Sequence, residues 1–145
     1  MDEAIILLKI TSLERCLRRI QGKIPADCAT LAKDLDRQDI IALNLERAIQ
    51  ICVDIASHIV AELDLAAPLT MAESFGVLCQ AGILSEPVAK RMQKSVGFRN
   101  IAVHEYDAIN WDVVFAIITD HLGDFRKYAA EIVDWMKIRG ERLES

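Results

Sequence analysis

Helix-breaking residues are scarce in this chain, with only 3 prolines and 6 glycines among its 145 residues. Proline and glycine mark most turns, so their scarcity leaves room for long helices and few tight turns. Aromatic residues make up only 6% of the chain, whereas 52% of it is hydrophobic. This length supports one hydrophobic core. We therefore expect an all-α fold in a single domain over residues 1–145.

The cysteines of the chain do not indicate a functional site. The four cysteines (Cys16, Cys28, Cys52 and Cys79) form no C-x-x-C pair, and three of them lie in apolar helical patterns, where cysteine acts as a small hydrophobe. The acidic start at residues 1–3 is unlike a signal peptide, and no stretch approaches the roughly 20 apolar residues that span a bilayer. We predict a reduced, cytoplasmic protein without disulfides, structural zinc or a membrane segment.

Basic residues are fewer than acidic ones, which gives a net charge of -5 and a pI near 5.2. This balance argues against a protein that coats nucleic acid non-specifically. Basic residues nevertheless gather in two places, and each cluster taken alone fits a solvated helix face. The second has more weight because it leads into Arg99. The clusters are Arg15, Arg18, Arg19 and Lys23, and then Lys90, Arg91, Lys94 and Arg99.

Apolar residues recur at three- and four-residue steps in the first half of the chain. This spacing predicts helices over residues 3–21 and 37–63, with a weaker, short helix over residues 27–36 between them. The apolar face of the segment 37–63 is wider than a single seam, which suits a bundle core or a dimer contact.

Capping residues mark the helices of the second half. Thr70 with Glu73 forms a predicted capping box, and Ser85 is a predicted N-cap for the helix that follows. Asn110 is expected to cap a last helix over residues 111–139. The elements together predict a four- to five-helix up-and-down bundle with short loops.

Residues 99–106, which read RNIAVHEY, lie at the predicted end of the fourth helix. Arg99 carries a rigid cationic fork that suits phosphate. His104 can exchange a proton near neutral pH. Asn100 and Tyr106 add an amide and a phenol to the same short stretch, which makes it the candidate functional site.

Metal-independent RNA cleavage needs a base for the 2′-hydroxyl, an acid for the leaving 5′-oxygen and a cation for the phosphorus oxygens. His104 suits the proton transfers and Arg99 the electrostatic role, whereas Asn100 can orient the histidine or bind the sugar-phosphate. The expected product is a 2′,3′-cyclic phosphate, and DNA should resist because it lacks the 2′-hydroxyl. This chemistry requires neither a metal ion nor another cofactor.

A structural interpretation stands beside the catalytic one. An arginine and a histidine five residues apart also occur by chance, and Tyr106 beside an apolar helix would ordinarily be a core aromatic. His58 and His121 lie in helical patterns without neighbours at metal-ligand spacing, so we interpret both as structural and predict no metal site.

The spacing Arg99-x4-His104-x-Tyr106 resembles the R-x4-H-x-Y signature of HepT-like ribonuclease toxins, a family of the HEPN superfamily. The stretches 45–56 and 72–84 also resemble the family, and the resemblance covers roughly residues 40 to 130. In this order of helices the motif is specific, and no position of it departs from the family's pattern.

The resemblance implies an endoribonuclease toxin that forms a homodimer, with two motifs lining a shared cleft. It makes Arg99 and His104 catalytic and implies an MntA-like nucleotidyltransferase antitoxin as partner. In such pairs the antitoxin can transfer AMP to the motif tyrosine, here Tyr106. A bulky, charged nucleotide at that position would block the cleft and repel RNA.

Two other interpretations remain open at this stage. The chain could be a non-catalytic helical subunit that binds nucleotide or substrate for a partner nucleotidyltransferase, or a plain dimeric scaffold. Replacing His104 by alanine separates catalysis from a phosphate-binding role, and replacing Arg99 tests the scaffold.

Overall fold

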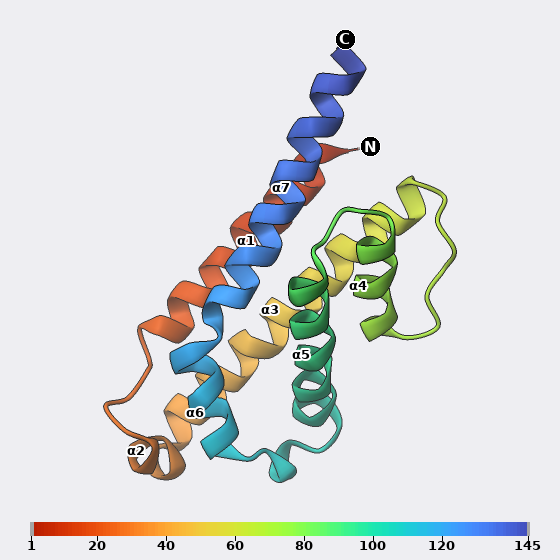
Figure 1. The fold of residues 1–145 in the computed structure, drawn as a ribbon. Coiled ribbons are helices and arrows are strands. Elements are labelled where there is room, and N and C mark those ends of the chain that lie inside the picture. The colour runs from red at the N-terminus through yellow and green to blue at the C-terminus, as the bar shows by residue number, and fades with distance from the viewer. Residues whose placement is uncertain (1, 145) are drawn as a thin grey trace.

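The computed structural model describes the backbone of residues 2–144 and the side chains of residues 2–140. Every regular element in this described part is helical, which confirms the all-α bundle (Figure 1). Four long helices (α1, α3, α5 and α7) are joined through three short α-helices and one 3-10 turn. In order the elements are α1 (Glu3–Gln21), α2 (Cys28–Lys33), α3 (Leu35–Glu62), α4 (Met71–Gln80), α5 (Glu86–His104), η1 (Tyr106–Ala108), α6 (Trp111–Asp120) and α7 (Leu122–Glu144).

Side-chain caps set the helix starts, because they accept hydrogen bonds from N–H groups that the helix leaves free. Thr70, Ser85 and Asn110 each cap a helix in this way, which confirms three predicted starts. The Glu73 carboxylate accepts from the backbone N–H of Leu69 at 2.8 Å. The predicted capping box therefore closes on Leu69 and not on Thr70 itself.

The single last helix predicted over residues 111–139 is wrong. The structure divides it into α6 and α7, which meet at His121, where the backbone leaves helical geometry (φ -121°, ψ 3°). Helix α6 packs against α2, whereas α7 packs against α5, α1 and α3. One straight helix could not follow both sets of partners, so the break lets each half cover a different part of the bundle.

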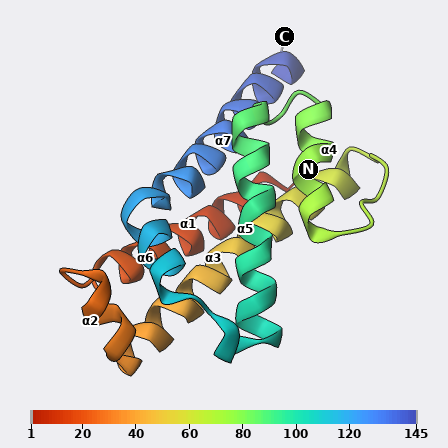
Figure 2. The same ribbon diagram turned by 60° about the horizontal axis from the view of Figure 1, so that its bottom comes forward.

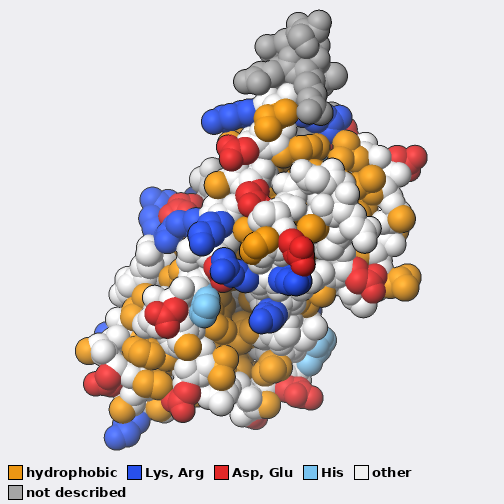
Figure 3. All heavy atoms as spheres, in the orientation of Figure 1, with side chains coloured by type: hydrophobic (Ala, Val, Ile, Leu, Met, Phe, Trp, Pro, Cys, Tyr) orange, Lys and Arg blue, Asp and Glu red, His pale blue; other side chains and the backbone are white. Residues whose placement is uncertain are grey.

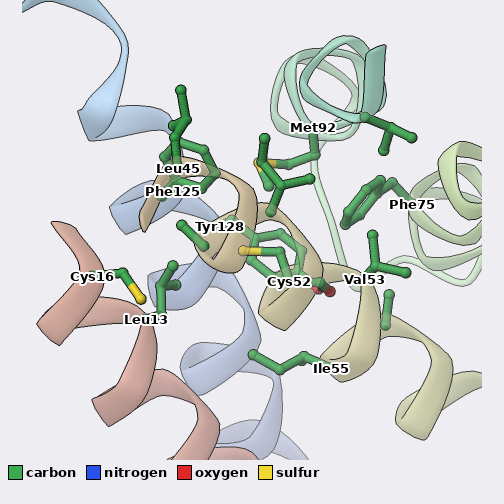
Figure 4. Close-up of a cluster of buried hydrophobic side chains, with 14 of the residues drawn as sticks. Leu13, Cys16, Leu45, Cys52, Val53, Ile55, Phe75, Met92, Phe125 and Tyr128 are labelled. Carbon is green, nitrogen blue, oxygen red and sulfur yellow. Dashed lines mark hydrogen bonds between the residues drawn. The ribbon is translucent and has the colours of Figure 1, made fainter. Parts of the chain in front are cut away.

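Helix α3 is the centre of the bundle. Helix α1 packs along one side of it, and α4 and α5 pack along another (Figures 1 and 2). Tyr128 of α7 is fully buried against α3, and its O–H donates to the carbonyl of Cys52 at 2.8 Å. Its ring meets Phe75 of α4 edge-on with centroids 5.5 Å apart (Figure 4). The hydrogen bond joins α7 to α3, and the ring contact joins α4 to α7.

The four cysteines carry free thiols in the structure. Among the described residues, none of the helices has both the length and the apolar character that crossing a bilayer requires.

Candidate active site at the end of α5

The motif straddles the point where α5 ends, as its spacing predicts. Arg99 and Asn100 lie in the last turns of α5, and His104 is its final residue. Glu105 ends the helix with an N–H bond to the carbonyl of Ile101, and Tyr106 opens the short η1 turn. In Figure 1 this end of α5 and η1 lie together at the bottom of the molecule, next to the start of α6.

The Arg99 side chain is partly buried and incompletely satisfied. Its Nε is buried and has no hydrogen-bond partner in the described part of the chain. Its Nη1 donates to Oδ1 of Asn100 at 3.2 Å. A buried donor without an acceptor costs about 1–3 kcal/mol. An anionic oxygen that enters the site would satisfy this donor, so the geometry favours a phosphate-bearing ligand.

His104 is exposed at the C-terminus of α5. Its imidazole forms no hydrogen bond or ion pair with any other described residue, so both ring nitrogens are available to a substrate. Asn100 is one turn before His104 on the helix. The side-chain oxygen of Asn100 accepts a hydrogen bond from Arg99 and not from the histidine. Asn100 was considered either to orient His104 or to bind the sugar-phosphate. Among the described residues, no hydrogen bond from Asn100 to His104 supports the first role.

Tyr106 is fixed at the surface and is not a core residue. Its side chain is 39% exposed, and its O–H donates to the carboxylate of Asp39 at 2.5 Å. Its ring meets Trp111 edge-on with centroids 6.1 Å apart. Partial burial raises the pKa of the phenol, and the hydrogen bond and negative charge of Asp39 raise it further. The phenol is therefore held neutral in a defined position two residues after His104.

Asp39 and Trp111 were not predicted as part of this site. Asp39 lies 67 residues before Tyr106 in the chain, and only the packing of η1 against α3 brings them together. Asp39 follows two other aspartates, Asp34 and Asp36, near the start of α3, so no local signal distinguishes it. Trp111 was predicted only as the first residue of the last helix.

The second basic cluster borders a hollow beside α5. A pocket of about 330 Å³ is lined by Arg91, Lys94 and Phe98 of α5, together with His121 and other residues of neighbouring helices. On the face shown in Figure 3, Lys and Arg side chains gather between two histidines. Part of this charge is paired, since Arg91 approaches Asp124 at 3.6 Å.

The histidines outside the motif have other surroundings. Nε2 of His58 is buried without a partner in the described part of the chain, and Nδ1 of His121 is 3.4 Å from a carboxylate oxygen of Asp124. Among the described residues, no group of three or more His, Cys, Asp or Glu side chains is placed to hold a metal ion. His104 is the histidine that lies in the motif, and because residues 99–104 are helical its direction differs from that of Arg99 by about 140° around α5.

Comparison with known proteins identifies the family. Residues 13–132 match the family described as Ribonuclease HepT-like. The mRNA nuclease HepT of Shewanella oneidensis is 38% identical over 124 residues, which cover 86% of this chain and 92% of the relative. The tRNA nuclease HepT of Aphanizomenon flos-aquae is 33% identical over 101 residues, or 70% of this chain and 69% of the relative.

Solved structures agree with this result. A toxin–antitoxin complex with AMP-PNP matches with a TM-score of 0.85 and 36% identity, over 90% of this chain and 98% of the other. The tri-AMPylated HEPN toxin of Shewanella oneidensis, in complex with the MNT antitoxin, matches with a TM-score of 0.84 and 36% identity, over 92% and 99%. The fold and the motif together define a HEPN-type ribonuclease toxin. The chain belongs to the ribonuclease HepT-like family.

Proposed function

We propose that this chain is the toxin of a toxin–antitoxin module, a metal-independent endoribonuclease that acts on cytoplasmic RNA. The observation that carries the proposal is the arrangement at the end of α5. Within the described part of the chain, Arg99 has a buried donor without an acceptor, and the exposed imidazole of His104 has no partner. These are the two kinds of group that phosphodiester cleavage requires, and the imidazole of His104 is exposed to a substrate.

In the proposed reaction, a base removes the proton of the RNA 2′-hydroxyl, and the resulting oxygen attacks the adjacent phosphorus. The bond to the 5′-oxygen breaks, and an acid protonates that leaving oxygen, which yields a 2′,3′-cyclic phosphate. Arg99 stabilises the charge on the phosphorus oxygens. Asn100 supports Arg99 and contributes to binding the sugar-phosphate.

One imidazole cannot serve as base and acid in the same step. The motif supplies a single histidine per chain, so we propose a homodimer in which two motifs line one cleft. The two copies of His104 then supply the base and the acid. This assignment gives the dimer a chemical reason besides the family resemblance.

We assign control of the site to Tyr106. One related structure contains AMPylated toxin in complex with an MNT antitoxin, so an MntA-like nucleotidyltransferase is the proposed partner. The phenol oxygen of Tyr106 attacks the α-phosphorus of ATP, pyrophosphate leaves, and the phenol proton is released. The product places a phosphodiester and a nucleoside two residues from His104, where they obstruct RNA and repel its backbone.

The decisive experiment incubates antitoxin-free protein with RNA in the presence of a chelator, after intact mass shows that Tyr106 is unmodified. Wild type should cleave RNA to cyclic-phosphate ends, and His104→Ala should be slower by about 10²- to 10⁴-fold. His121→Ala is the matched control, because His121 is exposed but lies outside the motif. A DNA oligonucleotide of the same sequence should remain intact.

Failure of unmodified wild-type protein to cleave any class of RNA would overturn the catalytic proposal. It would favour the other candidate, a helical subunit that binds nucleotide or substrate for the nucleotidyltransferase. Cleavage that survives in His104→Ala would instead overturn the role of the histidine.

A further inference from the structure

A second basic surface lies between α1 and α3, apart from the residues of the motif. A groove of about 410 Å³ runs between these helices. Arg15 and Arg19 of α1 and Arg47 of α3 line it, together with Asn44 and Gln50 of α3. Its volume lies within the range of protein sites for small ligands, or for one unit of a larger one.

The three arginines line the same groove and lie near one side chain, Cys16. Arg15 and Arg19 are four residues apart and therefore share a face of α1. All three guanidinium groups lower the pKa of the Cys16 thiol, which burial raises overall. Their charges therefore act on a common neighbour on the groove wall. The groove concentrates positive charge on a chain whose net charge is -5.

Among the described residues, these three arginines have no counter-ion. In the described part of the chain they form no ion pair or side-chain hydrogen bond, whereas Arg126 pairs with Glu14 at 3.2 Å. Three like charges around one groove repel one another unless an anion lies between them. Guanidinium groups bind phosphate through parallel N–H donors. The missing counter-ion is therefore expected to be a phosphate.

The groove also offers an unused acceptor. Oε1 of Gln50 is buried and has no partner among the described residues. The orientation of this amide is set by its Nε2, which donates to the carboxylate of Asp54 at 2.9 Å. A buried acceptor requires an O–H or N–H donor. A ribose 2′-hydroxyl beside a phosphate supplies both the donor and the anion.

Helix α3 contributes residues both to the groove and to the surroundings of the motif. Asp39, which holds Tyr106, is eight residues before Arg47. A helix rises 1.5 Å per residue, so the two positions are about 12 Å apart along the axis of α3. Both side chains belong to residues that are exposed. Helix α3 therefore carries both a residue of the groove and the hydrogen-bond partner of Tyr106.

We propose that the α1–α3 groove binds the ribose-phosphate backbone of the RNA substrate, with Arg15, Arg19 and Arg47 on a phosphate and Gln50 on a 2′-hydroxyl. The inference rests on the proposed ribonuclease function for the identity of the ligand. The groove positions the strand and takes no part in the chemistry. Its contribution is therefore expected in substrate affinity and not in the rate of the bound complex.

The test uses the full chain with His104→Ala, so that a short labelled RNA stays intact while its Kd is measured at several salt concentrations. Adding Arg47→Gln should raise the Kd about tenfold or more, because it removes a charge-assisted phosphate contact. It should also make the salt dependence shallower by about 0.7 in log–log slope, the value for one phosphate contact of a single strand. Arg18→Gln is the matched control, since it removes the same charge from α1 outside the groove.

A second pair of measurements separates ribose recognition from charge. Gln50→Leu should reduce the preference for RNA over a DNA oligonucleotide of the same sequence and leave the salt slope unchanged. With the cleavage-competent protein, Arg47→Gln should raise KM and leave kcat nearly unchanged. The thermal midpoint of each variant, measured in parallel, should stay within a few degrees of its parent.

Equal effects of Arg47→Gln and Arg18→Gln on Kd and salt slope would overturn the proposed role of the groove, because non-specific electrostatic attraction would then explain RNA binding. Loss of antitoxin binding with RNA affinity unchanged would also overturn it and would make the groove a protein contact. The two proposals fail separately. RNA that binds through the groove without being cleaved contradicts only catalysis, and normal cleavage with unchanged KM in Arg47→Gln contradicts only the groove.

Discussion

The two tyrosines of the chain make the same kinds of contact in opposite surroundings. Each donates its hydroxyl to α3 and meets another aromatic ring edge-on. Tyr128 is fully buried and donates to the carbonyl of Cys52, whereas Tyr106 is 39% exposed and donates to the carboxylate of Asp39. The first contact attaches α7 to the core, and the second attaches the motif loop to the same helix.

This difference shows how one helix serves both stability and function. Burial and a neutral acceptor make Tyr128 a structural residue that no reagent can reach. Partial exposure and the hydrogen bond to Asp39 leave the Tyr106 hydroxyl held in place and accessible, as the proposed modification requires. The five predictions below test that contrast between the two tyrosines.

The largest expected effect concerns modification. In the presence of ATP and the nucleotidyltransferase antitoxin, Tyr106→Phe should abolish the mass increase from AMP, because it removes the attacking oxygen. Tyr128→Phe should still be modified, since its hydroxyl is fully buried in the wild type. Intact-mass spectrometry of both variants measures this. Undiminished modification of Tyr106→Phe would exclude this phenol as the acceptor.

The free energy of unfolding should depend more on Tyr128 than on Tyr106. Tyr128→Ala leaves a large cavity beside Phe75 and should lower the free energy of unfolding by about 3–5 kcal/mol. Tyr106→Ala removes a side chain that is well exposed and should cost less than about 1.5 kcal/mol. Urea unfolding followed by circular dichroism compares them. Equal losses would show that the motif loop is as much a part of the core as α7.

The two phenols should also differ in their response to Asp39→Asn. Burial and then the Asp39 carboxylate raise the pKa of Tyr106, so removing the carboxylate should lower that pKa, whereas the pKa of Tyr128 is kept high mainly by burial and does not depend on Asp39. Ultraviolet titration should show one phenol ionising earlier in the variant than in wild type. An unchanged titration curve would mean that the hydrogen bond to Asp39 does not persist in solution.

The same shifts determine how stability depends on alkaline pH. A pKa raised by folding contributes stability that is complete below the ordinary tyrosine value of about 10 and is lost as pH rises further, because the unfolded chain ionises first. Asp39→Asn should therefore make the loss of stability above that pH less steep. The control is Asp107→Asn, which removes a nearby charge but leaves the hydrogen bond intact.

The smallest expected effect comes from Tyr128→Phe. It removes one buried hydrogen bond but keeps the ring, and should cost about 0.5–1.5 kcal/mol. Cleavage of RNA should be unchanged below the melting temperature, because the hydroxyl lies away from the motif. Denaturant midpoints with a parallel cleavage assay check this, and a loss of activity without a loss of stability would contradict the structural role.

Helix starts and the core were largely predictable from sequence, since they depend on neighbours in the chain. Ser85 and Asn110 cap helices because a short polar side chain can reach N–H groups two or three residues ahead. The break at His121 was not predictable, because apolar residues keep helical spacing across it. The break arises because α6 covers α2 while α7 covers other helices, which is a property of the assembled bundle.

The site divides in the same way. Arg99, His104 and Tyr106 are close in sequence, so their common place at the end of α5 follows from local helix signals alone. Asp39 could not be predicted as the partner of Tyr106, because the contact joins residues far apart in the chain. The α1–α3 groove likewise unites a predicted basic cluster on α1 with Arg47, which the sequence did not connect to it.

The sequence by itself determined the helical class, most helix ends and the position of the motif at the end of α5, because spacing and capping act over a few residues. Only the tertiary structure decided which donors lack acceptors, which tyrosine is accessible and which arginines face one another. Those properties depend on burial and on charges from different helices, and both arise only when the helices pack.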